Sequence, residues 1–379
     1  MALSAVLADD PTAALLTIDL SALQANYRLI ADRVAPAKAS ANIKADAYGL
    51  GIDLVVPALV EAGCSHFFVA TLSEAMSARE SAPNATIYVL NGFTGVAATI
   101  YKSYRLSAVL GSFEDINEFE KSLKGGLTLS APALHIDTGM NRLGLSMDEA
   151  RSYAERRKRE SSPLRLSLLM THFVESEIHN SSITEKQIAF FEEIRALFPN
   201  VPTSLSNSSG VFLENASAYD LVRPGYALYG GNPFLSEPNP MHPVIRLEAP
   251  IIQIRPVKKG TTIGYGGEYT ARRDMIIATL SIGYADGYPR GAKTTDKKSG
   301  AVCLIAGQPC KILGRVSMDL VMADITDCPP GDVTCGMMAT MIGDDITLDD
   351  VAAKSETIGY EILVHLGPRF RRRVLSSKD

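Results

Sequence analysis

The sequence contains few cysteines, and they lack the spacing that metal sites and disulfide frameworks use. There are five in 379 residues, and no two stand in a C-x-x-C arrangement. They are Cys64, Cys303, Cys310, Cys328 and Cys335. An odd and scattered set argues against a disulfide framework and against a cysteine-bound zinc ion. We therefore expect a reducing compartment and no metal site.

Long hydrophobic runs and an excess of positive charge are also missing. No apolar run reaches the ~18 residues that a membrane-spanning helix needs. The first residues, MALSAVLADDPTAALL, lack the basic start and long apolar core of a signal peptide. The net charge of −5 argues against nucleic acid or an anionic membrane as the main partner. We expect a cytoplasmic protein that binds neither.

Hydrophobic residues make up 46% of the chain, so a sizeable core can be buried, and 379 residues predict about two domains. Eight short apolar or β-branched segments are strand candidates, and amphipathic stretches separate most of them. These segments are residues 41–45, 66–71, 86–92, 106–111, 133–139, 164–173, 203–210 and 226–230. The alternation indicates an α/β protein and predicts parallel β-α units. The simplest arrangement is a closed (β/α)8 barrel of the TIM type, and the alternative is an open doubly wound sheet.

Two of the helical patterns carry N-terminal signals. Ser112 stands where it can cap the helix predicted by SFEDINEFEKSLKG. In SITEKQIAFFEEIRALF, Ser182 and Glu185 fit a capping box. Both patterns therefore predict where a helix begins.

The residue composition of the sequence changes after Pro233. The segment NPFLSEPNPMHP is rich in proline and is typical of a linker, and short β-like runs with glycine turns follow it. We predict a barrel over residues 1–240 and a mostly-β C-terminal domain over 241–379. The first ten or so residues could pack on the second domain.

Lys44 is the most unusual residue of the first strand candidate, ANIKA. It ends an apolar segment just before a small, glycine-bearing turn, ADAYGLG. Catalytic groups of barrels sit where strands end, and burial there leaves a lysine amine neutral and nucleophilic. The alternative is a lysine whose chain reaches from the strand end to solvent.

Four later segments place polar groups at strand ends. They are HIDTGMNRLG (135–144), THF (171–173), SNSSG (206–210) and VRPGYALYG (222–230). Serine, a glycine turn and tyrosine can hold a phosphate through hydroxyl and N–H groups. A reactive lysine, a phosphate cradle and a partner for an aromatic ring together fit pyridoxal 5'-phosphate (PLP).

In this order, these motifs resemble those of the alanine racemases, PLP enzymes with a (β/α)8 barrel and a C-terminal β domain. KADAYGLG is similar to the family's PLP-lysine motif KANAYGHG, and later segments follow in the family's order. These segments are IDTGMNRLG, THF, RPGYALYG, GYGGEY, GYADGYPR, GRVSMD and GYEIL. The resemblance implies interconversion of L- and D-alanine by two bases, with D-alanine supplied to bacterial peptidoglycan. It also implies a head-to-tail homodimer with shared active sites.

The resemblance also implies a role for particular residues. Lys44 would carry PLP and act as one base, and Tyr265, from the partner subunit, would be the second. The cofactor would further contact Tyr48, His172, Ser208, Arg223, Gly225, Tyr226 and Tyr360. The substrate side would include Arg142, Tyr284, Met318 and Asp319. A racemase needs one proton-transfer group on each face of Cα, so the pairing of Lys44 and Tyr265 makes chemical sense.

The sequence departs from the family pattern at several positions. His135 stands where many members have a carbamylated lysine beside the substrate arginine, so Arg142 must be held differently, by a bound anion or a nearby carboxylate. By resemblance, Arg223 would lie at the ring nitrogen of PLP. Ser204 replaces a histidine that in many members belongs to a hydrogen-bond relay behind this arginine, so we predict a different relay here. Leu50 and Asp46 replace the commoner histidine and asparagine of the lysine motif.

The same residues bear on three other functions. A non-catalytic PLP-binding barrel protein lacks the second β domain that residues 246–379 predict. A barrel-type decarboxylase of basic amino acids has different second-domain motifs and a cysteine near the substrate. A broader-specificity or serine racemase of the same fold stays open, and so does a catabolic role.

Overall fold

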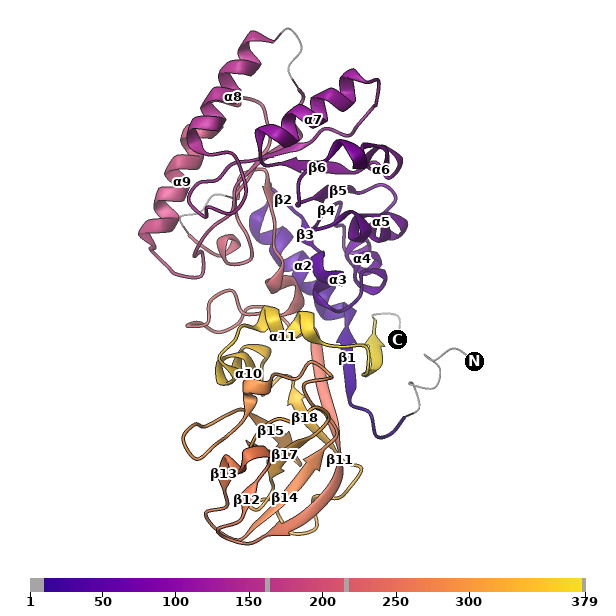
Figure 1. Ribbon diagram of the computed structural model, residues 1–379, viewed down its shortest axis with the longest axis vertical. Helices are drawn as coiled ribbons and strands as arrows, with labels where there is room; N and C mark the ends of the chain where they lie inside the picture. The colour runs from indigo at the N-terminus through magenta and orange to yellow at the C-terminus, as the bar shows by residue number, and fades with distance from the viewer. Residues whose placement is uncertain (1–9, 161–163, 215–217, 377–379) are drawn as a thin grey trace.

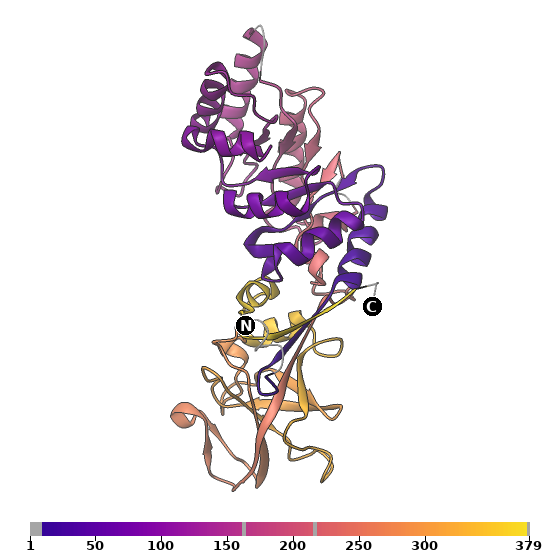
Figure 2. The same ribbon diagram turned by 90° about the vertical axis from the view of Figure 1, so that its right-hand side faces the viewer.

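The computed structural model describes residues 10–160, 164–214 and 218–376. Two lobes follow one another along the long axis, with most of the helices in the upper lobe and most of the long strands in the lower (Figures 1 and 2). Among the described residues, no helix has the length and apolar character needed to cross a membrane.

The upper lobe is a closed barrel of parallel strands. Its strands are β2 (Lys38–Ala39), β3 (Ala41–Asn42), β4 (His66–Val69), β5 (Thr86–Val89), β6 (Ser107–Leu110), β7 (Ala133–His135), β8 (Leu168–Met170), β9 (Thr203–Ser204) and β10 (Leu221–Val222). They pair in sequence order from β3 to β9, and β10 pairs with β2. The Arg223 N–H donates to Ser206 O over 2.8 Å, and the Asn42 N–H donates to Pro224 O over 3.0 Å. Since β2 and β3 are separated only by Ser40, these bonds close the barrel, and the predicted (β/α)8 architecture is confirmed.

Helices surround the barrel. They are α2 (Leu20–Val34), α4 (Ile52–Glu61), α5 (Leu72–Ser81), α6 (Ala98–Ser103), α7 (Phe113–Lys124), α8 (Met147–Arg159) and α9 (Ser182–Arg195), with short 3-10 turns η1 (Gly95–Ala97) and η2 (Ser209–Val211). A separate cluster of buried residues comes from six of the strands. Along each strand these residues alternate with those that pack on the helices, so they fill the barrel interior. The members of this cluster are Phe68, Tyr88, Val109, Ala133, Leu168, Met170 and Leu221.

The two helix-start predictions differ in outcome. Ser112 caps α7 as predicted, accepting from the Asp115 N–H. The capping box at Ser182 and Glu185 was wrong by one residue. Ser181 has the extended backbone of a cap and accepts from the free N–H groups of Ile183 and Thr184, whereas Ser182 is already helical.

The eighth strand lies earlier than predicted. Residues 226–230 are not a strand, because η3 (Tyr226–Tyr229) forms a 3-10 turn there. The Ser208 hydroxyl accepts from the N–H groups of Gly225 and Ala227, and the Leu228 N–H donates to Gly225 O, so these groups are not available to a sheet. The buried apolar side chains of this segment are those of a packed turn, and β10 forms just before it.

The lower lobe is a closed antiparallel sheet with two helices. Its main strands are β11 (Ile245–Val257), β14 (Met275–Leu280), β15 (Val302–Ile305), β16 (Gln308–Leu313), β17 (Val321–Asp324) and β18 (Met338–Ile342). The order is β14-β17-β16-β15-β18-β11, and β11 also pairs with β14. Smaller elements are β12 (Thr262–Ile263), η4 (Tyr265–Gly267), β13 (Tyr269–Thr270), η5 (Arg290–Ala292), α10 (Leu348–Ser355), α11 (Gly359–His365) and β19 (Arg371–Leu375). A mostly-β C-terminal domain is therefore confirmed.

The N-terminal strand belongs to the sheet of the lower lobe. β1 (Leu15–Asp19) pairs antiparallel with β11 and parallel with β19. Residues 1–9, which were expected to pack on this domain, lie outside the described residues. The division of the chain near residue 240 stays a prediction.

Candidate active site at the mouth of the barrel

The turn that begins at Lys44 is wound in the left-handed sense. In α3 (Lys44–Tyr48), the φ angles of Ala45, Asp46 and Ala47 are +53°, +52° and +53°, and that of Tyr48 is +57°. Left-handed backbone costs L-residues roughly 1–2 kcal/mol each, so the surroundings must hold it. The Ala47 N–H donates to Ile43 O over 2.9 Å, and Asp46 accepts from the Ile52 N–H over 2.9 Å. The motif after Lys44 therefore fixes a rare backbone shape at the strand end.

Helix α11 of the lower lobe presses on this turn. A Cβ atom on Gly49, which has φ of +83°, would lie 2.5 Å from Leu363 O, so no side chain fits there. The close approach brings the start of α11, with Tyr360, to the barrel mouth. The ring centroids of Tyr360 and Tyr48 are 6.2 Å apart.

Charges around Lys44 favour its neutral form. Partial desolvation by the barrel wall lowers the pKa of the Lys44 amine, and the guanidinium groups of Arg142 and Arg223 lower it further, while the Glu74 carboxylate opposes them. The side chain remains exposed at the mouth. Lys44 thus combines access with an amine that loses its proton more readily than a surface lysine, as a carbonyl nucleophile requires.

Arg223 is buried deep in the mouth, with 3% of its surface exposed. Its Nη1 donates to the Ser204 hydroxyl and its Nη2 to Thr171 O, each over 2.5 Å. Ser204 in turn donates to Leu221 O over 2.6 Å. Burial lowers the Arg223 pKa to about 9, so the group remains a cation at neutral pH. The altered relay expected from Ser204 is present: the serine contacts the arginine directly and passes the hydrogen bond to the backbone.

Two histidines beside this arginine are neutral. Burial and then the Arg223 and Arg142 cations lower the pKa of His172 well below its ordinary value. The same causes lower the pKa of His135 to about 4. His172 Nδ1 lies 3.5 Å from Arg223 Nη2. A neutral imidazole next to a buried cation can lie flat on an aromatic ring without adding charge.

The phosphate-binding residues expected from the sequence come together around Gly225. The Ser208 hydroxyl accepts from the Gly225 N–H over 3.0 Å and from the Ala227 N–H over 3.2 Å, which leaves its own hydrogen to donate. A Cβ atom on Gly225 would lie 2.2 Å from the Tyr48 hydroxyl oxygen. The rings of Tyr226 and Tyr360 stack at 4.1 Å. The free hydrogen of the Ser208 hydroxyl and the clustered hydroxyls of Tyr48 and Tyr360 fit a phosphate group, and with Lys44 and Arg223 the donor set fits PLP.

Arg142 lacks hydrogen-bond and ion-pair partners among the described residues. Its side chain is exposed and makes no hydrogen bond or ion pair with any described residue, although its charge acts on both Lys44 and His135. The neutral His135 supplies no negative charge to orient it. No carboxylate partner for Arg142 is found in the described part of the chain, so a bound anion is the remaining one of the two predicted arrangements.

The residues expected on the substrate side lie in the lower lobe. Tyr265 is 69% exposed, and Tyr284 and Met318 are also exposed. The Tyr284 N–H donates to Ser317 O and the Ala285 N–H to Met318 O, which joins the two loops. Asp319 accepts from Arg369 over 2.8 Å. These loops therefore present side chains outward.

One chain does not bring both predicted bases together. Strands β12 and β13, which flank the turn with Tyr265, lie near the end of the lower lobe that is remote from α3 (Figure 1). The barrel set, by contrast, surrounds Lys44. Within one chain, the Tyr265 turn is therefore not part of the site around Lys44.

Sequence reasoning missed Glu74. Its Oε1 accepts from the Ala45 N–H over 2.7 Å, and its Oε2 accepts from the N–H groups of Ala70 and Thr71. Thr71 and Glu74 form a capping box at the start of α5. That T-x-x-E signal was readable in the sequence, but its link to the Lys44 turn was not, because the turn comes from another part of the chain.

The fold and the site define a class: a PLP enzyme of the barrel type with a C-terminal β domain. Residues 18–233 match the alanine racemase N-terminal domain, and residues 244–374 match the alanine racemase C-terminal domain. The chain belongs to the alanine racemase family.

Individual relatives extend over nearly the whole chain. An alanine racemase of a Methylobacterium species is 48% identical over 96% of this chain and 98% of its own. A catabolic alanine racemase of Agrobacterium fabrum is 41% identical over 94% of this chain and 91% of its own. The crystal structure of the Bartonella henselae alanine racemase with covalently bound PLP has a TM-score of 0.89 and 35% identity, covering 96% of this chain and 99% of that one.

These findings confirm the activity and the cofactor expected from the motifs. The protein is a PLP-dependent amino-acid racemase, an isomerase acting on alanine. A non-catalytic barrel protein and a decarboxylase are not what the matches support.

Proposed function

We propose that Lys44 and Tyr265 of the partner subunit are the two proton-transfer groups of this racemase. The observation that carries the proposal is the position of the Lys44 amine next to a donor set for phosphate. Desolvation and two guanidinium groups lower the pKa of this amine. Bound PLP would draw electron density from the substrate and so acidify its Cα proton. Lys44 would transfer that proton on one face of Cα, and the tyrosine hydroxyl would transfer it on the other.

Arg223 would tune the reaction through the ring nitrogen of the cofactor. An arginine does not readily give up a proton, and with a pKa of about 9 Arg223 is charged at neutral pH. Next to this charged group, bound PLP would supply weaker electron withdrawal than it would beside a carboxylate. This would limit side reactions such as transamination. The neutral His172 would pack on the ring of the cofactor.

The substrate would be held by its carboxylate. Arg142 offers a guanidinium that no described residue engages, and the Met318 N–H makes no hydrogen bond with the described residues. Tyr284 and Tyr265 would crowd the remaining space and select a side chain as small as that of alanine. Replacing Tyr284 with alanine should then admit larger amino acids; continued exclusion of serine and 2-aminobutyrate would contradict this account of the pocket.

The active unit would be a head-to-tail homodimer with two shared sites. The remote position of the Tyr265 turn and the exposure of its side chain support this arrangement. The five free cysteines of the chain fit a cytoplasmic enzyme, and D-alanine made there would supply peptidoglycan.

The test is a chiral assay in heavy water with the PLP-loaded enzyme. L-alanine should give D-alanine that carries deuterium at Cα. With Tyr265→Phe, we expect deuterium exchange into only one of the two enantiomers and no racemisation, because one face keeps its base. Exchange into both enantiomers by this variant would show that Tyr265 is not the second base.

A further inference from the structure

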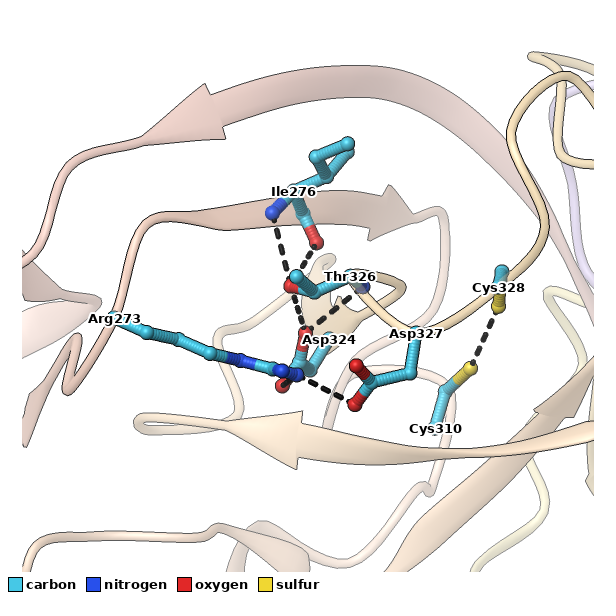
Figure 3. Close-up of polar contacts among 7 residues, drawn as sticks. All are labelled: Arg273, Ile276, Cys310, Asp324, Thr326, Asp327 and Cys328. Carbon is cyan, nitrogen blue, oxygen red and sulfur yellow. Dashed lines mark hydrogen bonds and ion pairs between the residues drawn. The ribbon is translucent and has the colours of Figure 1, made fainter.

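Two cysteine thiols lie in contact in the lower lobe. Cys310, on β16, and Cys328, in the segment after β17, have their sulfur atoms 3.7 Å apart, and both are free (Figure 3). A disulfide has its sulfurs about 2.05 Å apart, so side-chain rotation over a short distance would join them. The two residues come from neighbouring segments of one hairpin, which keeps them close in the folded protein.

The segment that carries Cys328 is anchored. Thr326 accepts from the Ile276 N–H over 3.0 Å and donates to Asp324 over 2.5 Å, and Arg273 donates to Asp327 over 2.5 Å (Figure 3). These contacts hold the two turn residues just before Cys328. The hydrogen bonds of the preceding turn therefore keep the two sulfurs close together.

The two thiols differ in access. Cys310 is 3% exposed, whereas Cys328 is partly exposed. Both line a surface cavity of about 630 Å³, together with Arg272, Lys311 and Asp324. A small oxidant can enter a cavity of this size, and it meets Cys328 first.

We propose that Cys310 and Cys328 form a reversible disulfide when the protein meets hydrogen peroxide. The Cys328 sulfur attacks one peroxide oxygen, the O–O bond breaks, and a sulfenic acid and one water form. The Cys310 sulfur then attacks the Cys328 sulfur, the S–O bond breaks, and the released hydroxide takes the Cys310 proton as a second water. Both thiols are oxidised and one hydrogen peroxide is reduced, so the step is balanced.

The order of attack follows from burial. Burial raises the pKa of the Cys310 thiol, so it is a poor first nucleophile. It can still attack a sulfenic acid, because it already touches the sulfur. In a reducing compartment, the pair would return to two thiols through thiol exchange.

The other cysteines are unsuited to this chemistry. Cys303 is fully buried, and its thiol donates to Cys310 O over 3.6 Å. Cys64 is buried in the upper lobe, and the exposed Cys335 makes no contact with another thiol among the described residues. No group of three or more metal-binding side chains occurs in the described part of the chain, which favours a redox pair over a metal site here.

The position gives the bond a structural consequence. Strand β16 runs directly into Gly314 and Arg315, and the loop with Met318 follows before β17. A disulfide between Cys310 and Cys328 would tie the base of the hairpin whose turn carries these residues. It would also close a loop in the unfolded chain and so stabilise the lower lobe.

The test uses the PLP-loaded enzyme in a Cys335→Ser background, which removes the exposed thiol. After treatment with one equivalent of hydrogen peroxide, the mass should fall by two hydrogens, and peptide mapping should find Cys310 linked to Cys328. Dithiothreitol should restore both thiols. In Cys328→Ser, the mass loss should disappear.

Separate alkylation of Cys310 and Cys328 after oxidation would overturn the proposal. So would conversion of Cys328 to a sulfinic acid while Cys310 stays reduced, or an unchanged loss of two hydrogens in Cys328→Ser. Phenylarsine oxide, which binds thiol pairs, gives an independent check without oxidation. In the parent protein it should block alkylation of both Cys310 and Cys328. In Cys328→Ser it should block alkylation of neither Cys310 nor Cys303.

Discussion

Glu74 accepts a hydrogen bond from the Ala45 N–H over 2.7 Å, which ties the first turn of α5 to the left-handed turn at Lys44. The same carboxylate accepts from the N–H groups of Ala70 and Thr71 over 2.8 Å and 3.1 Å. Three backbone donors thus converge on one carboxylate. Glu74 is a positioning residue: it holds the backbone from which the reactive lysine extends, and its charge opposes the lowering of the Lys44 pKa.

Glu74→Gln should therefore weaken catalysis without removing a reacting group. An amide has only one acceptor oxygen, so at least one of the three N–H groups loses its partner, and we expect kcat to fall roughly tenfold. Loss of the charge should lower the Lys44 pKa further. The pH midpoint for PLP uptake by the apoprotein should then shift downward, because the amine becomes neutral at a lower pH. Steady-state kinetics and absorbance titration measure the two effects.

Glu80→Gln, on the exposed side of the same helix, is the matched control and should behave as the parent enzyme. If Glu74→Gln lowers kcat but leaves the pH midpoint of PLP uptake in place, the carboxylate acts on helix stability alone and not on the lysine.

The left-handed turn makes a prediction about stability. Ala45 has φ of +53° and is exposed, so glycine there relieves backbone strain and removes little packing. Ala45→Gly should leave the free energy of unfolding unchanged or raise it by up to about 1 kcal/mol. Ala353→Gly, at an exposed position of the right-handed helix α10, should lower it by about 1 kcal/mol. Urea unfolding of the two variants compares the signs directly. Equal destabilisation by both would mean that the turn is not left-handed in solution.

The neutral histidines predict a loss of stability in mild acid. The pKa of His135 falls from its ordinary value of 6.5 to about 4 in the folded protein, so between these values the unfolded chain binds more protons. Stability must then fall as pH falls from 6.5 towards 4, and His135 alone should contribute about 2 kcal/mol between pH 7 and pH 5. Unfolding free energies of the holoenzyme across this range give the slope.

His135→Asn should flatten that slope, whatever it does to the stability at pH 7. The exposed His365→Asn is the control and should keep the slope of the parent. A slope that His135→Asn leaves unchanged would mean that His135 takes up its proton in the folded state.

Much of the site could be predicted from the sequence because it lies at the ends of strands. Lys44 and His172 each lie two residues after the end of a strand, and parallel strands bring such ends to one face of a barrel. The eighth strand was misplaced because the apolar run at Tyr226 suits a buried turn as well as a strand. Periodicity alone does not separate the two for so short a run.

Other features depend on contacts between distant segments. Alanine does not signal a left-handed turn, and the turn at Ala45 exists because Glu74 and the following helix supply partners for its backbone. The contact between Cys310 and Cys328 depends on how β17 and its following turn fold back along β16. Neither contact has a local signature in the sequence.

Shared active sites predict that two inactive variants restore each other. Lys44→Ala lacks the lysine and Tyr265→Phe lacks the tyrosine, so each homodimer should be inactive. In a mixed dimer, the barrel with Lys44 meets the β domain with Tyr265 at one of the two sites. Co-expression with different tags and random pairing should give about a quarter of the parent activity, since half of the dimers are mixed and each has one intact site.

Purified mixed dimers should reach about half of the parent kcat per dimer, with an unchanged KM, because the intact site has every native residue. Mixing the two variants after purification, without subunit exchange, is the control and should give no activity. If purified mixed dimers are inactive, Lys44 and Tyr265 do not serve one site across the interface. Activity in a homodimer of either variant would remove that residue from the pair of bases.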